Sequence, residues 1–274
     1  MKINKTGLPY IGSKKAIADK IVNIIGNTDK TIYDIFGGGG AITCELAYNG
    51  NTVVYNDKDT ASYNVVKMVL NDDINYKSLI VPRDEFIRIK ELTERTTKEE
   101  LVLVVNSFGC DRKSYAFSKV NSEERYNAMI DFVNKFNRFD KYGKYFKEKT
   151  GLPSSKYRLP QFGRIMQLIK MGKIPSENIE FYNKDYTYFK NVKDSVFYLD
   201  PPYFNTTDLY RESIIKNELI EFCDTLTKNG NKVFISEYEP FSDRMKIVAE
   251  FDGRGSTLNS GKSNNKKEKL FEFK

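Results

Sequence analysis

Short apolar runs alternate with longer amphipathic segments in both outer parts of the chain. Five runs are rich in β-branched and aromatic residues, which predicts strands. They cover residues 31–36, 52–57, 178–183, 195–200 and 231–237. Three segments have apolar residues at helical spacing, namely 41–50, 59–70 and 212–230. Strands that alternate with helices predict an α/β fold with a mostly parallel, doubly wound sheet, and residues 268–274 are expected to add an edge strand.

The middle of the chain breaks this alternation. A polar stretch from Asn71 to Glu100 leads into a segment whose apolar residues have helical spacing over 123–139. We therefore expect a mainly helical insertion at residues 73–173, carried by a core domain built from residues 1–72 and 174–274.

Positive charge is concentrated in this insertion. Residues 101–173 contain 15 Lys and Arg against 6 Asp and Glu, a local net charge of +9, whereas the whole chain carries +7. Basic residues interleaved with aromatics and amides are typical of a nucleic-acid surface, although a solvated helical face would have the same composition. The candidate DNA-binding residues are Arg112, Lys113, Tyr115, Lys119 and Arg125.

Composition excludes several kinds of chemistry. The chain has no histidine, which removes the Ser-His-Asp triad, the Cys-His pair and the His-rich zinc sites. Its three cysteines are far apart and form no C-x-x-C pair, so neither a metal site nor a disulfide framework is expected. With no run of about 20 apolar residues and no secretory signal, the protein is expected in the cytoplasm.

The glycines after the first strand indicate a nucleoside site. In DIFGGGGAI (34–42), Gly37 and Gly39 would let a ligand approach the backbone, and Asp57 follows Gly37 by 20 positions, the interval expected for a ribose acceptor. The third glycine of a dinucleotide fingerprint is missing, and GLPYIGSK (7–14) has the serine and lysine of a P-loop in the wrong order. S-adenosylmethionine is the nucleoside cofactor that remains.

A single carboxylate stands at the end of the fourth predicted strand, in FYLDPPYF (197–204). Pro201 and Pro202 keep the turn extended, so that Asp200 and a backbone carbonyl form two acceptors suited to an NH₂ group. Tyr203 would offer its ring for stacking on the target base. The alternative is a capped turn stiffened by two prolines.

The order of YIGSK, DIFGGGGAI, a basic insertion and DPPY resembles the Dam-type, D12-class adenine-N6 DNA methyltransferases. The resemblance covers nearly the whole chain and includes FYNKDY (181–186) and the C-terminal KKEKLFEF. It implies a Rossmann-like methyltransferase fold with an inserted target-recognition domain. It also implies a catalytic role for Asp200, Pro201, Pro202 and Tyr203. The cofactor-binding positions that it implies are Tyr10, Lys14, Phe36, Gly37, Gly39, Asp57, Asp185 and Asp200.

By this resemblance the protein would methylate N6 of an adenine flipped out of double-stranded DNA, using S-adenosylmethionine and no metal, as in restriction-modification systems of bacteria or phages. Segment 106–119 resembles only loosely the corresponding segment of family members that recognise GATC, so the DNA recognition sequence stays open. The oligomeric state is open as well, a monomer included. A cytosine-N4 or RNA methyltransferase and a catalytically silent DNA-binding homologue remain alternatives.

Overall fold

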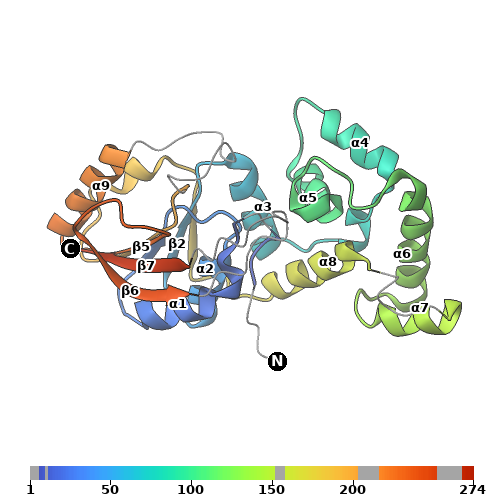
Figure 1. The fold of residues 1–274 in the computed structure, drawn as a ribbon, viewed down its shortest axis with the longest axis horizontal. Coiled ribbons are helices and arrows are strands. Elements are labelled where there is room, and N and C mark those ends of the chain that lie inside the picture. The colour runs from blue at the N-terminus through green and yellow to red at the C-terminus, as the bar shows by residue number, and fades with distance from the viewer. Residues whose placement is uncertain (1–5, 10–11, 152–157, 203–215, 252–266) are drawn as a thin grey trace.

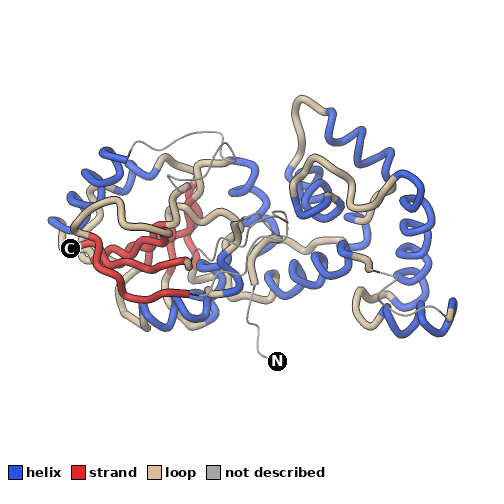
Figure 2. The backbone as a smooth tube through the Cα atoms, in the orientation of Figure 1, coloured by secondary structure: helices blue, strands red, loops and turns tan. Residues whose placement is uncertain are grey.

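The computed structural model describes residues 6–9, 12–151, 158–202, 216–251 and 267–274. These residues form a lobe that contains the sheet and a second lobe built of helices (Figure 1). All strands lie in the first lobe, as Figure 2 shows. None of the helices in the described ranges is long and apolar enough to span a membrane.

The sheet has seven strands in the order β3-β2-β1-β4-β5-β7-β6. Neighbouring strands from β3 to β5 run parallel, and β7 runs antiparallel to both β5 and β6. The predicted α/β class with a mostly parallel sheet is confirmed. The strands are β1 (Ile32–Asp34), β2 (Val53–Asn56), β3 (Ile179–Tyr182), β4 (Val196–Leu199), β5 (Lys232–Glu237), β6 (Met245–Phe251) and β7 (Glu268–Phe273).

Helices cover both faces of the sheet because successive strand residues point to opposite sides. In β4, Val196 and Tyr198 join the hydrophobic cluster beneath α1 (Ala18–Ile25), α2 (Ala41–Tyr48) and α3 (Thr60–Asn71). Phe197 and Leu199 join the opposite cluster beneath α9 (Lys216–Lys228). All four side chains are buried, which explains why β4 is apolar throughout.

The C-terminal hairpin differs from the expectation. Segment 268–273 does form a strand, but β7 lies between β5 and β6, so the prediction of an edge strand was wrong. The edge is β6, which the sequence pattern missed. Its register against β7 shifts between Ile247 and Ala249, and this irregularity breaks the period-2 alternation that identifies a strand.

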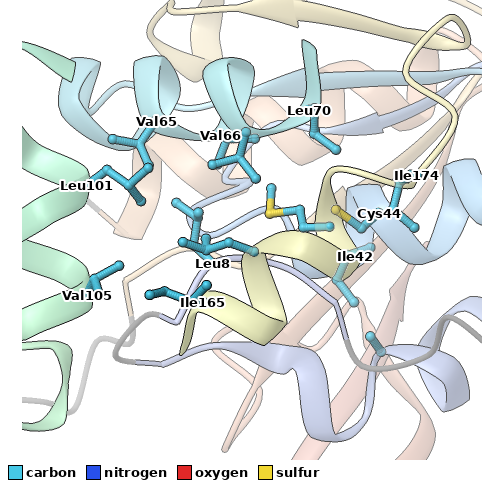
Figure 3. Close-up of a cluster of buried hydrophobic side chains, with 14 of the residues drawn as sticks. Leu8, Ile42, Cys44, Val65, Val66, Leu70, Leu101, Val105, Ile165 and Ile174 are labelled. Carbon is cyan, nitrogen blue, oxygen red and sulfur yellow. The ribbon is translucent and has the colours of Figure 1, made fainter. Parts of the chain in front are cut away.

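The helical lobe is formed by the chain between α3 and β3. A capping box between Thr96 and Glu99 begins α5, whose apolar residues are all buried. The predicted domain boundaries at 73 and 173 stay a prediction, because one hydrophobic cluster runs from the sheet lobe into this lobe; Figure 3 shows Leu8 and Val65 facing Leu101 and Ile165. The helices are α4 (Arg83–Glu91), α5 (Thr97–Asn106), α6 (Ser122–Phe136), α7 (Tyr142–Thr150) and α8 (Pro160–Met171).

Candidate active site at the carboxyl edge of the sheet

The strand order reverses between β1 and β4, and their carboxyl ends lie side by side. In an open α/β sheet this switch point is where a ligand-binding crevice forms. The glycine loop follows β1, Asp57 follows β2, and Asp200 follows β4. Asp200 is more than 140 positions from the glycine loop and from Asp57 in the sequence, yet all three lie at the carboxyl edge of the sheet.

The glycine loop is held closely against the second strand. Gly37 N donates to Asn56 O over 2.9 Å, and the Tyr55 hydroxyl donates to Gly38 O over 2.8 Å. A Cβ at Gly37 would lie 2.3 Å from Tyr55 Cε2, which leaves no room for a side chain. Gly38 and Gly40 adopt positive φ angles of 49° and 70°. Packing at one position and backbone conformation at two others thus require glycine.

Asp57 ties this loop to the second strand. Its Oδ2 accepts a hydrogen bond from Gly38 N over 2.7 Å, and its Oδ1 accepts one from Asp59 N over 2.8 Å. Burial raises the pKa of the Asp57 carboxyl to about 6, against the opposing effect of these two backbone donors. Each oxygen still has a second lone pair, so the carboxylate can accept ribose hydroxyls while it holds the loop.

A second carboxylate, Asp34, lies beneath the loop at the end of β1. It is 1% exposed, and its Oδ2 accepts hydrogen bonds from Thr43 N and Thr43 Oγ1 over 3.1 and 2.7 Å. Burial raises the pKa of Asp34 to about 7; the bonds from Thr43 oppose this rise, and the charges of Asp200 and Asp57 add to it. Asp34 therefore fixes the start of α2 through Thr43.

Lys14 joins the N-terminal segment to the end of β4. Its Nζ lies 2.6 Å from Asp200 Oδ2 and 3.2 Å from Glu268 Oε1, and its side chain is only 7% exposed. Burial disfavours the ammonium, but attraction to the two carboxylates outweighs burial and keeps the pKa of Lys14 above its ordinary value. Lys14 thus stays charged and is a direct partner of the predicted catalytic aspartate.

The remaining cofactor candidates lie around the same edge. Asp185 begins the short helix after β3, accepts from Thr187 N and Oγ1, and pairs with Lys58 over 3.3 Å. The partly buried Phe36 ring lies 5.5 Å from that of Tyr186. Gly39 is part of the glycine loop, and Pro201 and Pro202 follow the end of β4; the roles predicted for all three stay predictions. Tyr10 and Tyr203 lie outside the described residues.

The predicted DNA-binding residues differ in their surroundings. Tyr115 is 7% exposed, its hydroxyl donates to Val81 O over 2.9 Å, and its ring packs on Phe86. The Arg112 guanidinium lies 3.5 Å from the buried carboxylate of Glu100, which also binds Arg95 over 2.6 Å. Both candidates contribute to the packing of the helical lobe, which the sequence did not reveal.

Lys113 and Lys119 are exposed on the loop between α5 and α6, and Arg125 is partly buried at the start of α6. The loop is closed by an isolated bridge between Ser107 and Tyr115. Phe108, which follows the bridge residue Ser107, is 56% exposed. The accessible positive charge of this loop therefore lies on Lys113 and Lys119 rather than on Arg112.

The sequence model for the D12 class N6 adenine-specific DNA methyltransferases matches residues 10–257. The chain belongs to this family. The resemblance inferred from the motifs is thereby confirmed, and the sheet described above agrees with the methyltransferase fold that the resemblance implied.

Two curated bacterial proteins are similar to this D12-class chain. Modification methylase LlaI of Lactococcus lactis subsp. lactis is 25% identical over 224 residues, which cover 77% of this chain and 32% of that protein. Modification methylase StsI of Streptococcus sanguinis is 22% identical over 254 residues, which cover 86% of this chain and 35% of that protein. The D12-class chain matches about one third of the length of each relative.

Three residues at the site of this D12-class chain were not singled out from the sequence. Asp34 stands before the glycines. The signal that could have identified it in the sequence is a charged residue at the end of an apolar strand. The Asn56 amide donates to Ile35 O over 2.9 Å and to Lys184 O over 3.0 Å, which joins the ends of three strands. Glu268 lies in a run of alternating charges that gives no sign of its contact with Lys14.

Proposed function

We propose that this chain transfers a methyl group from S-adenosylmethionine to N6 of an adenine in double-stranded DNA. The observation that carries the proposal is the position of Asp200 at the switch point of a D12-class sheet, beside the glycine loop and paired with buried Lys14. Both curated relatives are named modification methylases, which supports a role in marking DNA.

The residues at the edge suit a cationic nucleoside. Asp57 can accept from ribose hydroxyls, the glycine loop leaves the backbone open, and Phe36 offers an aromatic surface. The carboxylates of Asp57 and Asp200 lie at this edge, and negative charge there favours a ligand with a positive sulfonium. When bound, S-adenosylmethionine would supply an electrophilic methyl group whose bond to sulfur breaks with its electron pair left on sulfur.

Asp200 and the backbone carbonyl of the DPPY turn would hold the target amine. By accepting its two hydrogens, they turn the nitrogen lone pair out of conjugation with the ring and toward the methyl group. The amine nitrogen becomes positively charged as the new bond forms, and a proton then leaves to Asp200 or water. Such a reaction depends on placement and electrostatics more than on a strong base, which agrees with a chain that lacks histidine.

Double-stranded DNA is the proposed partner, with Lys113 and Lys119 as phosphate contacts. An adenine stacked in a duplex cannot present its amine to Asp200, so the base must be flipped out at a cost of a few kcal/mol. Tyr203 stays our proposed stacking partner for the flipped base. The proposal does not include a DNA recognition sequence.

Incubation with duplex DNA and S-adenosylmethionine labelled in its methyl group tests the function. Mass analysis of the nucleosides should find the label in N6-methyladenine, and Asp200→Ala should reduce incorporation by at least a thousandfold. Asp243→Ala, which changes an exposed aspartate between β5 and β6, is the matched control and should keep full activity. Label in cytosine or RNA alone, or none from folded protein, would contradict the proposal.

A further inference from the structure

The basic face of α8, formed by Gly163, Arg164, Gln167 and Lys170, lies where the two lobes meet. Helix α8 begins in the helical lobe and ends beside the sheet lobe (Figure 1). Gly163, Gln167 and Lys170 follow one another at intervals of four and three residues, so they lie on one side of the helix, with Arg164 next to them. Gly163 is exposed, and among the described residues nothing lies within 4 Å of its Cβ position. This side of α8 is therefore open to a ligand.

Lys15 joins the N-terminal segment to this face. Its Nζ donates to Gln167 Oε1 over 2.6 Å, and Gln167 Nε2 donates to Gly7 O over 2.6 Å. Lys15 directly follows Lys14, the partner of Asp200. The basic face of α8 is thus connected to the predicted catalytic edge through the N-terminal segment.

Arg164 connects the same face to the loop between α5 and α6. Its Nη1 donates to Val105 O, near the end of α5, over 2.6 Å. Its guanidinium also interacts with the thiol of Cys110. Lys113, one of the proposed phosphate contacts, is three positions further along this loop. A continuous run of contacts therefore leads from Asp200 to the proposed DNA-binding loop.

The lysines at this face lack acidic partners. Within the part of the chain that the structure describes, neither Lys15 nor Lys170 forms an ion pair with a carboxylate, although both are partly buried. Burial lowers the pKa of Lys15; Cys110 opposes this effect, and the charge of Lys170 adds to it. Burial also raises the pKa of the Cys110 thiol, so the thiol is neutral at pH 7. Partly buried cations that repel one another are stabilised when an anion binds between them.

We propose that the basic face of α8 is a second contact for the DNA backbone, in which Lys15 and Lys170 bind phosphates close to the target nucleotide. The inference rests on the proposed function, because the phosphates are those of the duplex whose adenine enters the site at Asp200. Phosphates carry the negative charge that this face lacks, and the open surface at Gly163 lets a sugar-phosphate strand lie against the helix. Such contacts position the duplex and carry no sequence information.

The salt dependence of DNA binding tests the proposal. The probe is a fluorescein-labelled duplex, followed by fluorescence anisotropy with S-adenosylhomocysteine present so that no methyl group is transferred. Lys170→Gln should weaken binding about fivefold at physiological salt and reduce, by about one, the slope of the logarithm of the binding constant against that of the salt concentration. Lys228→Gln is the matched control, since Lys228 is exposed in the last turn of α9 on the opposite face of the sheet, and it should leave the slope unchanged.

A double variant separates phosphate binding from packing between the lobes. Lys15→Gln combined with Lys170→Gln should reduce the slope by about two, because each lysine releases the counterion of its own phosphate. A role in packing alone would lower the urea midpoint and leave the slope at its wild-type value. An unchanged slope in folded Lys170→Gln and in the folded double variant would overturn the inference.

Calorimetric titration with S-adenosylhomocysteine distinguishes DNA phosphates from the carboxylate of the cofactor's amino-acid tail. Lys170→Gln should bind this ligand as tightly as the wild type does. Weaker binding together with an unchanged salt slope would assign Lys170 to the cofactor and overturn the inference. A wild type that binds duplex DNA but transfers no methyl group would contradict the proposed function and leave these slopes measurable.

Discussion

Gly37→Ala probes how tightly the glycine loop is packed. The added Cβ would lie 2.3 and 2.5 Å from two carbons of the Tyr55 ring and 3.2 Å from Asn56 O. The ring cannot move easily, because Tyr55 is fully buried and its hydroxyl donates to Gly38 O. The loop cannot withdraw without loss of the 2.9 Å bond from Gly37 N to Asn56 O. The methyl group therefore has to displace the ring or the loop.

The expected loss of stability follows from displacement of either the Tyr55 ring or the glycine loop. Overpacking a core by one methyl group costs about 1–3 kcal/mol, and a lost buried hydrogen bond adds about 1 kcal/mol. We expect Gly37→Ala to lower the free energy of unfolding by roughly 2–4 kcal/mol. Because Gly38 N would shift relative to Asp57, binding of S-adenosylmethionine should weaken at least tenfold.

Urea unfolding followed by circular dichroism, together with calorimetric titration of the cofactor, measures both effects. Gly163→Ala is the matched control: this glycine lies within α8, nothing is within 4 Å of its Cβ position, and the change should stabilise the protein by about 0.5–1 kcal/mol. Tyr55→Val removes the ring, so in that background Gly37→Ala should cost much less. Equal stability of Gly37→Ala and wild type, or additive losses in the double variant, would refute the packing argument.

Three further changes test other contacts. The Asp34 carboxyl titrates near its ordinary value of 3.8 in the unfolded chain but near 7 when folded, so wild-type stability should fall by up to about 4 kcal/mol as the pH rises from 4 to 7. Urea midpoints of Asp34→Asn should fall less over this range, because the contribution of Asp34 is gone while that of Asp57 remains, and curves parallel to wild type would contradict the prediction. Arg112→Ala should cost about 1–2 kcal/mol of stability, because it leaves buried Glu100 with one fewer partner, and an unchanged urea midpoint would argue against this contact. Lys113→Ala should leave stability unchanged. It should reduce, by about one, the slope of the logarithm of the DNA-binding constant against the logarithm of the salt concentration. An unchanged slope would show that Lys113 does not contact DNA phosphates.

The sequence by itself determined the features that depend on neighbouring residues. Buried parallel strands are apolar along their whole length, so each run predicted a strand wherever its neighbours lay. The glycine loop and Asp57 were predicted because the 20 positions from Gly37 to Asp57 contain one turn, one helix and the next strand. The DPPY motif was recognised locally as well, because prolines act on the adjacent φ angles, and the role predicted for it stays a prediction.

Only the tertiary structure decided what depends on residues far apart in the chain. The contacts of Lys14 with Asp200 and Glu268 span 186 and 254 positions, and no local pattern encodes them. A basic or aromatic residue in a polar segment looks the same whether it faces solvent or a buried partner, so only the packing of the helical lobe distinguishes Arg112 and Tyr115 from exposed Lys113. The order of β6 and β7 likewise depends on which strand edge β7 finds when the chain folds back, a choice made by long-range pairing rather than by periodicity.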